Sequence, residues 1–300
     1  MGLLLLGPPE RAAVWSEICS EVGEVFYHEV APVEEVTYLA CWQPPADLSV
    51  YPNLRVVICV GAGVDQMPVM PEGIALVRTY AASVDEMVRD WVVMATLMLH
   101  RDMPSYLEQA REGLWQGGAI SLSRGAKVGI MGMGRIGSLA AETLGGMGFD
   151  VLGWSRSGRG PQDVRMFDAS GIDAFLAEAE TLICLLPLTS QTRGLMDDAF
   201  LAKLPEGARL VQAGRGAQLP LDALRRALES GKVASAMLDV TDPEPLSANH
   251  WAWSDPRVIV TPHVAGQTDA REGVEHALAV IRADRSREKL PGLVDQTLGY

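Results

Sequence analysis

From Lys127 onward, strand-like apolar segments alternate with helical patterns along the chain. The segments "KVGIMG", "DVLGW", "TLICLLP", "ARLVQAG" and "VASAMLDV" are apolar on both faces, and amphipathic runs such as "LDALRRALESG" separate them. Strands of this kind that alternate with helices are typical of a parallel sheet covered by helices on both sides. The segments before Lys127 show the same alternation of strands and helices less regularly, so the sequence predicts an α/β protein with two domains.

Composition narrows the classes of function. The formal net charge is -13, whereas a nucleic-acid surface needs clustered Lys and Arg, so we expect no nucleic-acid partner. The longest apolar run, which begins at Trp91, is about half as long as a membrane span needs, and "MGLLLLGPPE" lacks the basic segment of a signal peptide. We therefore expect a cytoplasmic protein with no membrane association. The four cysteines lack metal-type spacing and are expected to be buried free thiols, with no metal site.

A glycine motif follows the strand "KVGIM" and opens a helix. Gly132, Gly134 and Gly137 have the spacing GxGxxG. Gly132 is expected to make the tight turn, Gly134 to let a pyrophosphate approach the backbone, and Gly137 to let helix and strand pack closely. The N-terminus of the helix offers N–H groups and partial positive charge to the phosphates. The motif predicts a dinucleotide-binding domain of the Rossmann type.

The next strand lacks the acidic residue that usually binds the adenosine ribose at its end. An Asp or Glu at its end would accept a hydrogen bond from the 2′-hydroxyl and disfavour a 2′-phosphate, but "VLGWSRSGRG" places Ser155, Arg156 and Ser157 there. Asp150 stands about 16 Å away, at the other end of the strand. Because a guanidinium and hydroxyls suit a phosphate, the sequence predicts NADP(H) as the preferred cofactor and NAD(H) as a weaker one. The alternative is that Arg156 is a solvated loop charge.

Three later strands are predicted to end on the same edge of the sheet, where open α/β proteins bind ligands. Their segments "LVQAGRGAQL", "AMLDVTDPEPL" and "IVTPHVAG" bring Arg215, Glu244 and His263 to that edge. Taken singly, each residue also has an ordinary explanation, as an ion-pair partner, a loop charge or a structural histidine.

With these motifs in place, the chain resembles the family of D-isomer-specific 2-hydroxyacid dehydrogenases, and within it the glyoxylate/hydroxypyruvate reductases. The similarity covers nearly the full length. It rests on "VGAGVD" (60–65), "GMGRIG" (132–137), "LPLTSQTRGL" (186–195), "AGRGAQL" (213–219), "LDVTDPEPL" (238–246), "TPHVAG" (261–266) and "VDQTLGY" (294–300), with "CWQPP" and "GWSRS" pointing to the reductase branch. Gln212 stands where the family usually has Asn, and Asp90 where a Glu is common. Neither change removes a group that the chemistry requires.

The resemblance implies roles for the three residues at the sheet edge, and these roles also make chemical sense. A small 2-oxo acid needs a cation that holds its carboxylate and polarises its ketone, which Arg215 supplies. The ketone oxygen gains negative charge as a hydride arrives and needs a proton donor, which His263 supplies. Glu244 is implied to orient that ring and favour its charged form.

The resemblance also implies the binding residues. In the first domain, the backbone amides of Ala62 and Gly63 either cradle the substrate carboxylate or belong to a plain tight turn. Trp42 either lines the substrate pocket or belongs to the core. Asp239 is expected to face the nicotinamide carboxamide. The implied cofactor contacts are Gly132, Gly134, Arg135, Ile136, Gly137, Ser155, Arg156, Ser157, Leu186, Pro187, Thr192, Ala213, Asp239, Ala265 and Gly266.

The resulting expectation is an NADPH-dependent reductase that converts glyoxylate to glycolate and hydroxypyruvate to D-glycerate, and that forms a homodimer. Residues 1–95 and 273–300 are expected to form the substrate-binding domain, or catalytic lid, and 96–272 the dinucleotide-binding domain, with the active site in the cleft between them. The first domain is discontinuous because the final helical pattern, 270–288, is expected to pack on it. Two alternatives remain open. One is a dehydrogenase for a bulkier 2-oxo acid such as phenylpyruvate, and the other is a non-catalytic protein that senses NAD(P).

Overall fold

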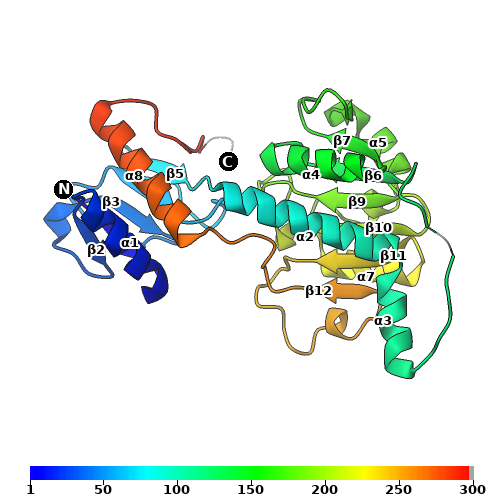
Figure 1. Cartoon of the computed structure of the whole chain (residues 1–300). Coiled ribbons are helices and arrows are strands. Elements are labelled where there is room, and N and C mark those ends of the chain that lie inside the picture. The colour runs from blue at the N-terminus through cyan, green and yellow to red at the C-terminus, as the bar shows by residue number, and fades with distance from the viewer. Residues whose placement is uncertain (120, 297–300) are drawn as a thin grey trace. The chain divides into compact units, whose positions relative to one another are not determined.

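The computed structural model describes residues 1–119 and 121–296. The chain divides into two compact units: unit 1 combines Met1–Val84 with the segment that begins at Gln267, and unit 2 is Asp85–Gly266. Each unit is an α/β structure around its own parallel sheet (Figure 1). This confirms the predicted α/β class and the discontinuous first domain. The predicted functional boundaries stay a prediction, and the last four residues of "VDQTLGY" lie outside the described residues.

Unit 1 contains a five-stranded parallel sheet in the order β2-β1-β3-β4-β5. Its strands are β1 (Gly2–Leu6), β2 (Phe26–His28), β3 (Val36–Cys41), β4 (Val56–Cys59) and β5 (Ala75–Arg78). A 3₁₀ turn, η1 (Val33–Glu35), precedes β3, and the helices α1 (Pro9–Glu21) and α8 (Ala270–Ser286) lie side by side against the sheet (Figure 1). Trp15 of α1 and Ile281 of α8 share one buried cluster with Leu3 and Tyr38, so the last helix packs on the first domain as predicted.

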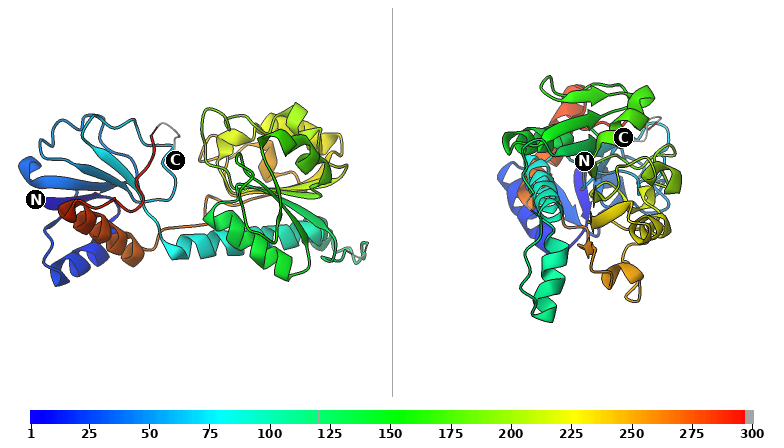
Figure 2. Two further views of the ribbon diagram at one scale, coloured as in Figure 1. Left: turned by 90° about the horizontal axis from the view of Figure 1, so that it is seen from above. Right: turned by 90° about the vertical axis from the view of Figure 1, so that its right-hand side faces the viewer.

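Unit 2 contains a seven-stranded parallel sheet in the order β12-β11-β10-β9-β6-β7-β8. Its strands are β6 (Lys127–Met131), β7 (Asp150–Trp154), β8 (Arg165–Phe167), β9 (Thr181–Cys184), β10 (Ala208–Gln212), β11 (Val233–Leu238) and β12 (Val258–Val260). Its helices are α2 (Ala82–His100), which starts three residues before the unit, α3 (Met103–Glu112), α4 (Arg135–Gly146), α5 (Ile172–Glu178), α6 (Asp198–Leu201) and α7 (Leu221–Glu229), with the 3₁₀ turns η2 (Ala169–Gly171), η3 (Gly216–Gln218) and η4 (Trp251–Trp253). The helices α2 and α4 lie along one face of the sheet, and α5 and α7 cover the other (Figure 2).

Two details differ from the sequence prediction. The sequence pattern over 84–112 predicts a single helical segment, whereas the structure has two helices there, because Asp102 takes a left-handed conformation with φ 55° and separates them. Pro104 then lies in the first turn of α3, where its missing N–H costs no hydrogen bond. The strand β8 was not predicted, since it has only three residues and lies at the sheet edge.

The buried cysteines agree with expectation, since all four are free thiols with buried side chains. No helix in the described part of the chain is long and apolar enough to cross a membrane. Across those same residues, no three His, Cys, Asp or Glu side chains gather as metal ligands do.

Candidate active site

The tips of six strands form one row at the carboxyl edge of the sheet in unit 2. Parallel pairing places Met131 of β6 beside Trp154 of β7 and Cys184 of β9, and continues from Cys184 to Gln212, Leu238 and Val260 at the ends of β10, β11 and β12. The loops that leave these tips carry the residues singled out from the sequence, so the register of the sheet brings them together.

The glycine motif has the predicted geometry. Gly132 turns with φ 102°, and a Cβ there would stand 2.8 Å from the carbonyl oxygen of Leu185. A Cβ on Gly137 would stand 2.0 Å from the carbonyl oxygen of Gly132, so only glycine lets α4 pack this closely on the turn. Gly134, in contrast, faces open space, and no side chain caps the N-terminus of α4 behind it. This cradle of backbone amides fits a dinucleotide pyrophosphate.

Arg135, the first residue of α4, forms an ion pair with Asp85 of α2. Its Nε donates to Asp85 Oδ2 over 2.9 Å, and its Nη2 also contacts that oxygen. Ile136 beside it is half-buried. The pairing ties the glycine motif to α2, a contact that the sequence did not indicate.

The loop after β7, residues 155–160, lies next to the glycine turn because Gly132 N–H donates to the Trp154 carbonyl over 2.9 Å. Arg156 and Ser157 are exposed, and Arg156 Nη1 lies 3.5 Å from Gln191 Oε1. The Ser155 hydroxyl donates to the Arg159 carbonyl over 2.8 Å, so it stabilises the loop itself.

Asp150 pairs with Lys127 at the opposite end of the strands, as predicted. The residue that follows the tip of β7 is therefore Ser155, and the acid of this strand lies at its other end.

The loop after β9 is closed by a hydroxyl. Thr192 Oγ1 donates to the Pro187 carbonyl over 2.7 Å and accepts from the Thr189 N–H over 2.8 Å. Leu186 is buried and Pro187 exposed. The predicted cofactor residue Thr192 thus shapes the loop through its hydroxyl.

Arg215 sits in a loop that we call the arginine loop (213–217), after β10. A Cβ on Gly214 would stand 2.9 Å from the Leu186 carbonyl oxygen, and a Cβ on Gly216 would stand 1.9 Å from the Thr241 carbonyl carbon. The two glycines therefore let the arginine loop contact the backbone of both neighbouring loops. Arg215 itself is half-buried, and its Nη1 donates to the Gly214 carbonyl over 2.8 Å.

His263 and Glu244 face each other at hydrogen-bond distance. His263 Nδ1 lies 2.8 Å from Glu244 Oε2, while Glu244 Oε1 accepts from the Thr241 N–H over 3.0 Å. Because a carboxylate only accepts, Nδ1 carries the hydrogen, and Nε2 is the ring atom that can exchange a proton with a substrate. The side chains of His263 and Glu244 are 34% and 39% exposed, so solvent and small molecules reach the pair.

Asp239 holds the loop that carries His263. Its Oδ1 accepts from Thr261 Oγ1 over 2.6 Å and from the Val264 N–H over 2.9 Å, and its Oδ2 accepts from the Ala265 N–H over 2.8 Å. These bonds hold His263 in a left-handed conformation with φ 53°, which costs about 1–3 kcal/mol for a residue other than glycine. The predicted nicotinamide contact of Asp239 stays a prediction, while this supporting role was missed.

Ala213 and Gly266, the two remaining cofactor candidates, lie in loops at the same edge of the sheet. Ala213 N–H donates to the Cys184 carbonyl over 3.1 Å, and Gly266 is the half-buried last residue of unit 2.

The candidate substrate residues of unit 1 form a separate turn after β4. Trp42 is 49% exposed and so is not a core residue. A Cβ on Gly61 would stand 2.6 Å from its ring, which therefore lies directly against the turn that contains Ala62 and Gly63. Gln66 Nε2 donates to the backbone carbonyls of Trp42 over 3.1 Å and Gly63 over 3.3 Å, which ties the backbone of Trp42 to the turn.

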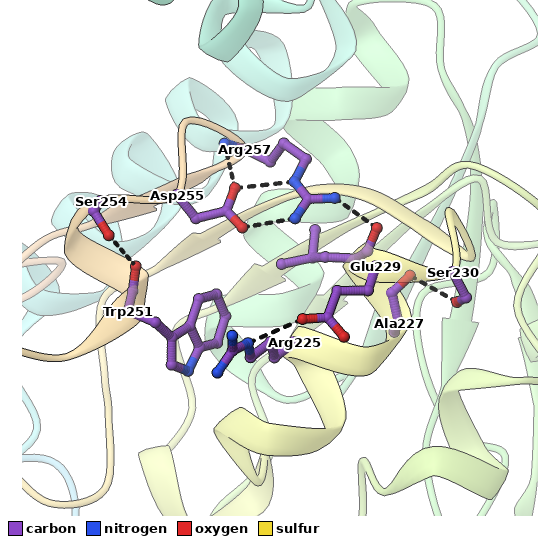
Figure 3. Close-up of polar contacts among 9 residues, drawn as sticks. Arg225, Ala227, Glu229, Ser230, Trp251, Ser254, Asp255 and Arg257 are labelled. Atoms are coloured by element: carbon purple, nitrogen blue, oxygen red, sulfur yellow. Dashed lines mark hydrogen bonds and ion pairs between the residues drawn. The ribbon is translucent and has the colours of Figure 1, made fainter.

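A cluster of paired arginine and acidic side chains lies beside η4 and the start of β12, at the end of that strand opposite its tip. Figure 3 shows that its arginines are engaged by carboxylates: Arg225 Nε donates to Glu229 over 3.0 Å, and Arg257 donates to Asp255 over 2.9 and 2.7 Å. Arg257 also donates to a backbone carbonyl of α7 over 2.6 Å. These contacts tie α7 to the loop before β12, and their charge is locally balanced.

Comparison with known proteins agrees with this geometry. The family model described as the NAD binding domain of the D-isomer specific 2-hydroxyacid dehydrogenases matches residues 93–265. A D-isomer specific 2-hydroxyacid dehydrogenase from Xanthobacter autotrophicus Py2, solved with NADPH and MES, is 32% identical, with a TM-score of 0.94 over 100% of this chain and 99% of that one.

A second solved structure is an NADPH-dependent glyoxylate/hydroxypyruvate reductase from Sinorhizobium meliloti, in complex with NADP and sulfate. It is 34% identical over 100% of both chains, with a TM-score of 0.92. A probable 2-hydroxyacid dehydrogenase from Rhizobium etli CFN 42, in complex with NADP, HEPES and L(+)-tartaric acid, is 30% identical over 100% of this chain and 99% of that one, with a TM-score of 0.90. The matched domain, the identity over the whole length and the row of strand-tip loops agree, and the chain belongs to the family of D-isomer specific 2-hydroxyacid dehydrogenases.

Proposed function

We propose that the protein is an NADPH-dependent reductase of small 2-oxo acids, acting on glyoxylate and hydroxypyruvate. The observation that carries the proposal is the contact of 2.8 Å between His263 and Glu244 on the sheet edge that also bears Arg215. The relative from Sinorhizobium meliloti, whose described activity is this one, supports the choice of substrates.

Arg215, His263 and Glu244 each have a separate role in the proposed reduction. Bound NADPH supplies the hydride. The Arg215 guanidinium binds the substrate carboxylate and polarises the ketone, and the Ala62 and Gly63 amides are a predicted second contact of that carboxylate. His263 Nε2 donates the proton that the ketone oxygen takes up, while Glu244 holds Nδ1–H and compensates the charge of the ring.

The proposed substrates are small because Trp42 lies beside the predicted carboxylate turn. Its ring lies against Gly61 and its backbone is bound by Gln66, so the indole occupies space beside this turn that a bulky substituent would need.

A panel of 2-oxo acids tests this function. Loss of NADPH absorbance is measured with glyoxylate, hydroxypyruvate, pyruvate and phenylpyruvate at matched concentrations, and the first two are expected to give the highest kcat/KM. Phenylpyruvate as the best substrate would assign the alternative dehydrogenase. Cofactor binding without turnover of any acid would assign the NAD(P)-sensing protein.

Replacing Arg156 with alanine is expected to lower the preference for NADPH over NADH by about 10- to 100-fold. A charge-assisted contact with the 2′-phosphate contributes roughly 1.5–3 kcal/mol, and about 1.4 kcal/mol corresponds to a factor of ten. The measurement is the ratio of kcat/KM for the two cofactors at fixed ionic strength.

Arg124→Ala is the matched control, because it removes the same charge from an exposed site before β6, at the other edge of the sheet. An Arg156→Ala protein that keeps the wild-type ratio would show that the loop after β7 does not select the cofactor. In the Arg156→Ala background, Ser155→Asp should favour NADH, because a carboxylate repels the 2′-phosphate and accepts from a 2′-hydroxyl.

A homodimer and a cytoplasmic location are part of the same proposal. Leu107 on α3 is 42% exposed, and Leu114 and Trp115 just after it are 53% and 102% exposed, which supports a contact with a second copy at this place. Light scattering of the purified protein would give the mass that decides the oligomeric state.

A further inference from the structure

We infer that Gln218 is a positioning residue for Arg215, and that it connects the arginine loop to the loop after β9. The inference rests on the proposed function, because it concerns the residue that would hold the substrate carboxylate. Gln218 is the last residue of η3 and is fully buried.

The amide of Gln218 bonds to both loops at once. Its Oε1 accepts from the Arg215 N–H over 2.9 Å, and its Nε2 donates to the carbonyls of Leu186 and Pro187, each over 3.0 Å. Both amide hydrogens and the oxygen therefore have partners, and this pattern permits one orientation of the side chain. A fully satisfied buried amide makes a rigid connection between the two loops.

Gln212, at the tip of β10, holds the other side of the same residue. Its Nε2 donates to the Arg215 carbonyl over 2.8 Å, and its Oε1 accepts from the Gly214 N–H over 3.4 Å. The backbone of Arg215 is thus bound on its N–H by one buried glutamine and on its carbonyl by another. Gly214 makes this possible, since a Cβ there would stand 2.5 Å from Gln218 Oε1.

The physical consequence concerns the placement of the guanidinium. The two glutamine amides hold the backbone of Arg215 together with the Gln218 N–H, which donates to the Arg215 carbonyl over 3.1 Å. A shift of this loop therefore moves the guanidinium relative to the substrate. A misplacement of about 1 Å can cost about 100-fold in rate. Gln218 would thus act through Arg215 and touch neither substrate nor nicotinamide.

Gln218→Met is the primary test, because methionine has a similar volume and no amide. It should lower kcat/KM for glyoxylate by about 10- to 100-fold, mainly through a higher KM. In an Arg215→Ala background the same change should alter kcat/KM by less than about twofold, since a residue that acts through Arg215 has nothing left to position. The inference would be overturned if the loss of kcat/KM in the double variant equalled the product of the losses in Gln218→Met and Arg215→Ala.

A readout without substrate or cofactor accompanies the kinetics. Hydrogen exchange of the peptide that contains Arg215 should become faster in Gln218→Met, because the Arg215 N–H loses its acceptor. Gln109→Met is the matched control: Gln109 is on α3, the only hydrogen bond of its side chain in the described residues is to Ser105 over 3.4 Å, and both exchange and kcat/KM should stay as in the wild type. Unchanged exchange at Arg215 in Gln218→Met would also overturn the inference.

Gln218→Glu adds a pH profile that a purely structural role would not produce. A protonated glutamic acid can still accept from Arg215 and donate to one carbonyl, whereas the ionised form would face the Leu186 and Pro187 oxygens. Burial raises the pKa of such a carboxyl group. The ratio of variant to wild-type kcat/KM should therefore rise as pH falls, and a flat ratio would count against the inference.

These outcomes are separable from a failure of the proposed function. If the wild type reduces none of the acids, the function is wrong. If the wild type is active and Arg215→Ala is impaired, only the double variant, the exchange data and the pH ratio decide on Gln218.

Discussion

Replacing His263 with alanine is expected to lower kcat with glyoxylate by about 10²- to 10⁴-fold, the range that general acid catalysis supplies. The ring is bound to Glu244 through Nδ1 and belongs to the loop after β12, whereas the pyrophosphate cradle belongs to the loop after β6. NADPH affinity should therefore stay close to the wild-type value. Steady-state kinetics and a fluorescence titration with NADPH measure the two quantities separately.

Glu244→Gln is expected to lower kcat as well, but less than His263→Ala does. Glutamine keeps an acceptor for the Thr241 N–H and for His263 Nδ1–H but removes the negative charge, so kcat should fall less than in His263→Ala. If His263→Ala keeps more than about a tenth of wild-type turnover, the proton has another source, and the assignment of His263 fails.

Replacing Gly216 with alanine is expected to lower both kcat/KM and the stability of the protein. An added Cβ would stand 1.9 Å from the carbonyl carbon of Thr241 and 2.0 Å from its oxygen, and backbone atoms cannot rotate away as the end of a side chain does. The arginine loop must then separate from the segment that leads to Glu244. We expect kcat/KM to fall by about 100-fold and the free energy of unfolding to fall by about 1–3 kcal/mol.

Gly146→Ala is its matched control. Gly146 ends α4, and a Cβ there would meet no atom within 4 Å, so alanine should be neutral or slightly stabilising. Denaturant unfolding and kcat/KM are measured on both variants. A Gly216→Ala protein with wild-type activity would show that the contact between the two loops is dispensable for catalysis.

The features that sequence alone predicted are those that local pattern determines. The glycine motif, the strand tips and the order of Arg215, Glu244 and His263 follow from periodicity and from the rule that parallel strands end on one edge. The edge strand β8 and the break at Asp102 were missed, because three residues carry little pattern and a left-handed aspartate has no strong local signal.

The supporting contacts lay beyond prediction because their partners are far away in the chain. Asp239 bonds across 25 and 26 residues to the loop of His263, and Gln218 across 32 residues to Leu186. The sequence signal for these contacts is a polar side chain among apolar neighbours, as in "GAQLPL". Such a residue is expected to be hydrogen-bonded if buried, but the sequence does not name the partner.

The split of unit 1 around unit 2 sets an order of events during synthesis on the ribosome. The sheet of unit 1 emerges first, yet Val274, Ala277 and Ile281 of α8, which cover one side of its core, emerge after all of unit 2. Nascent chains that end near Gly266 would therefore carry a complete nucleotide-binding unit beside a sheet whose apolar surface is still uncovered. The core of the N-terminal unit, whose strands are translated first, is therefore completed only when the last helix of the chain has been made.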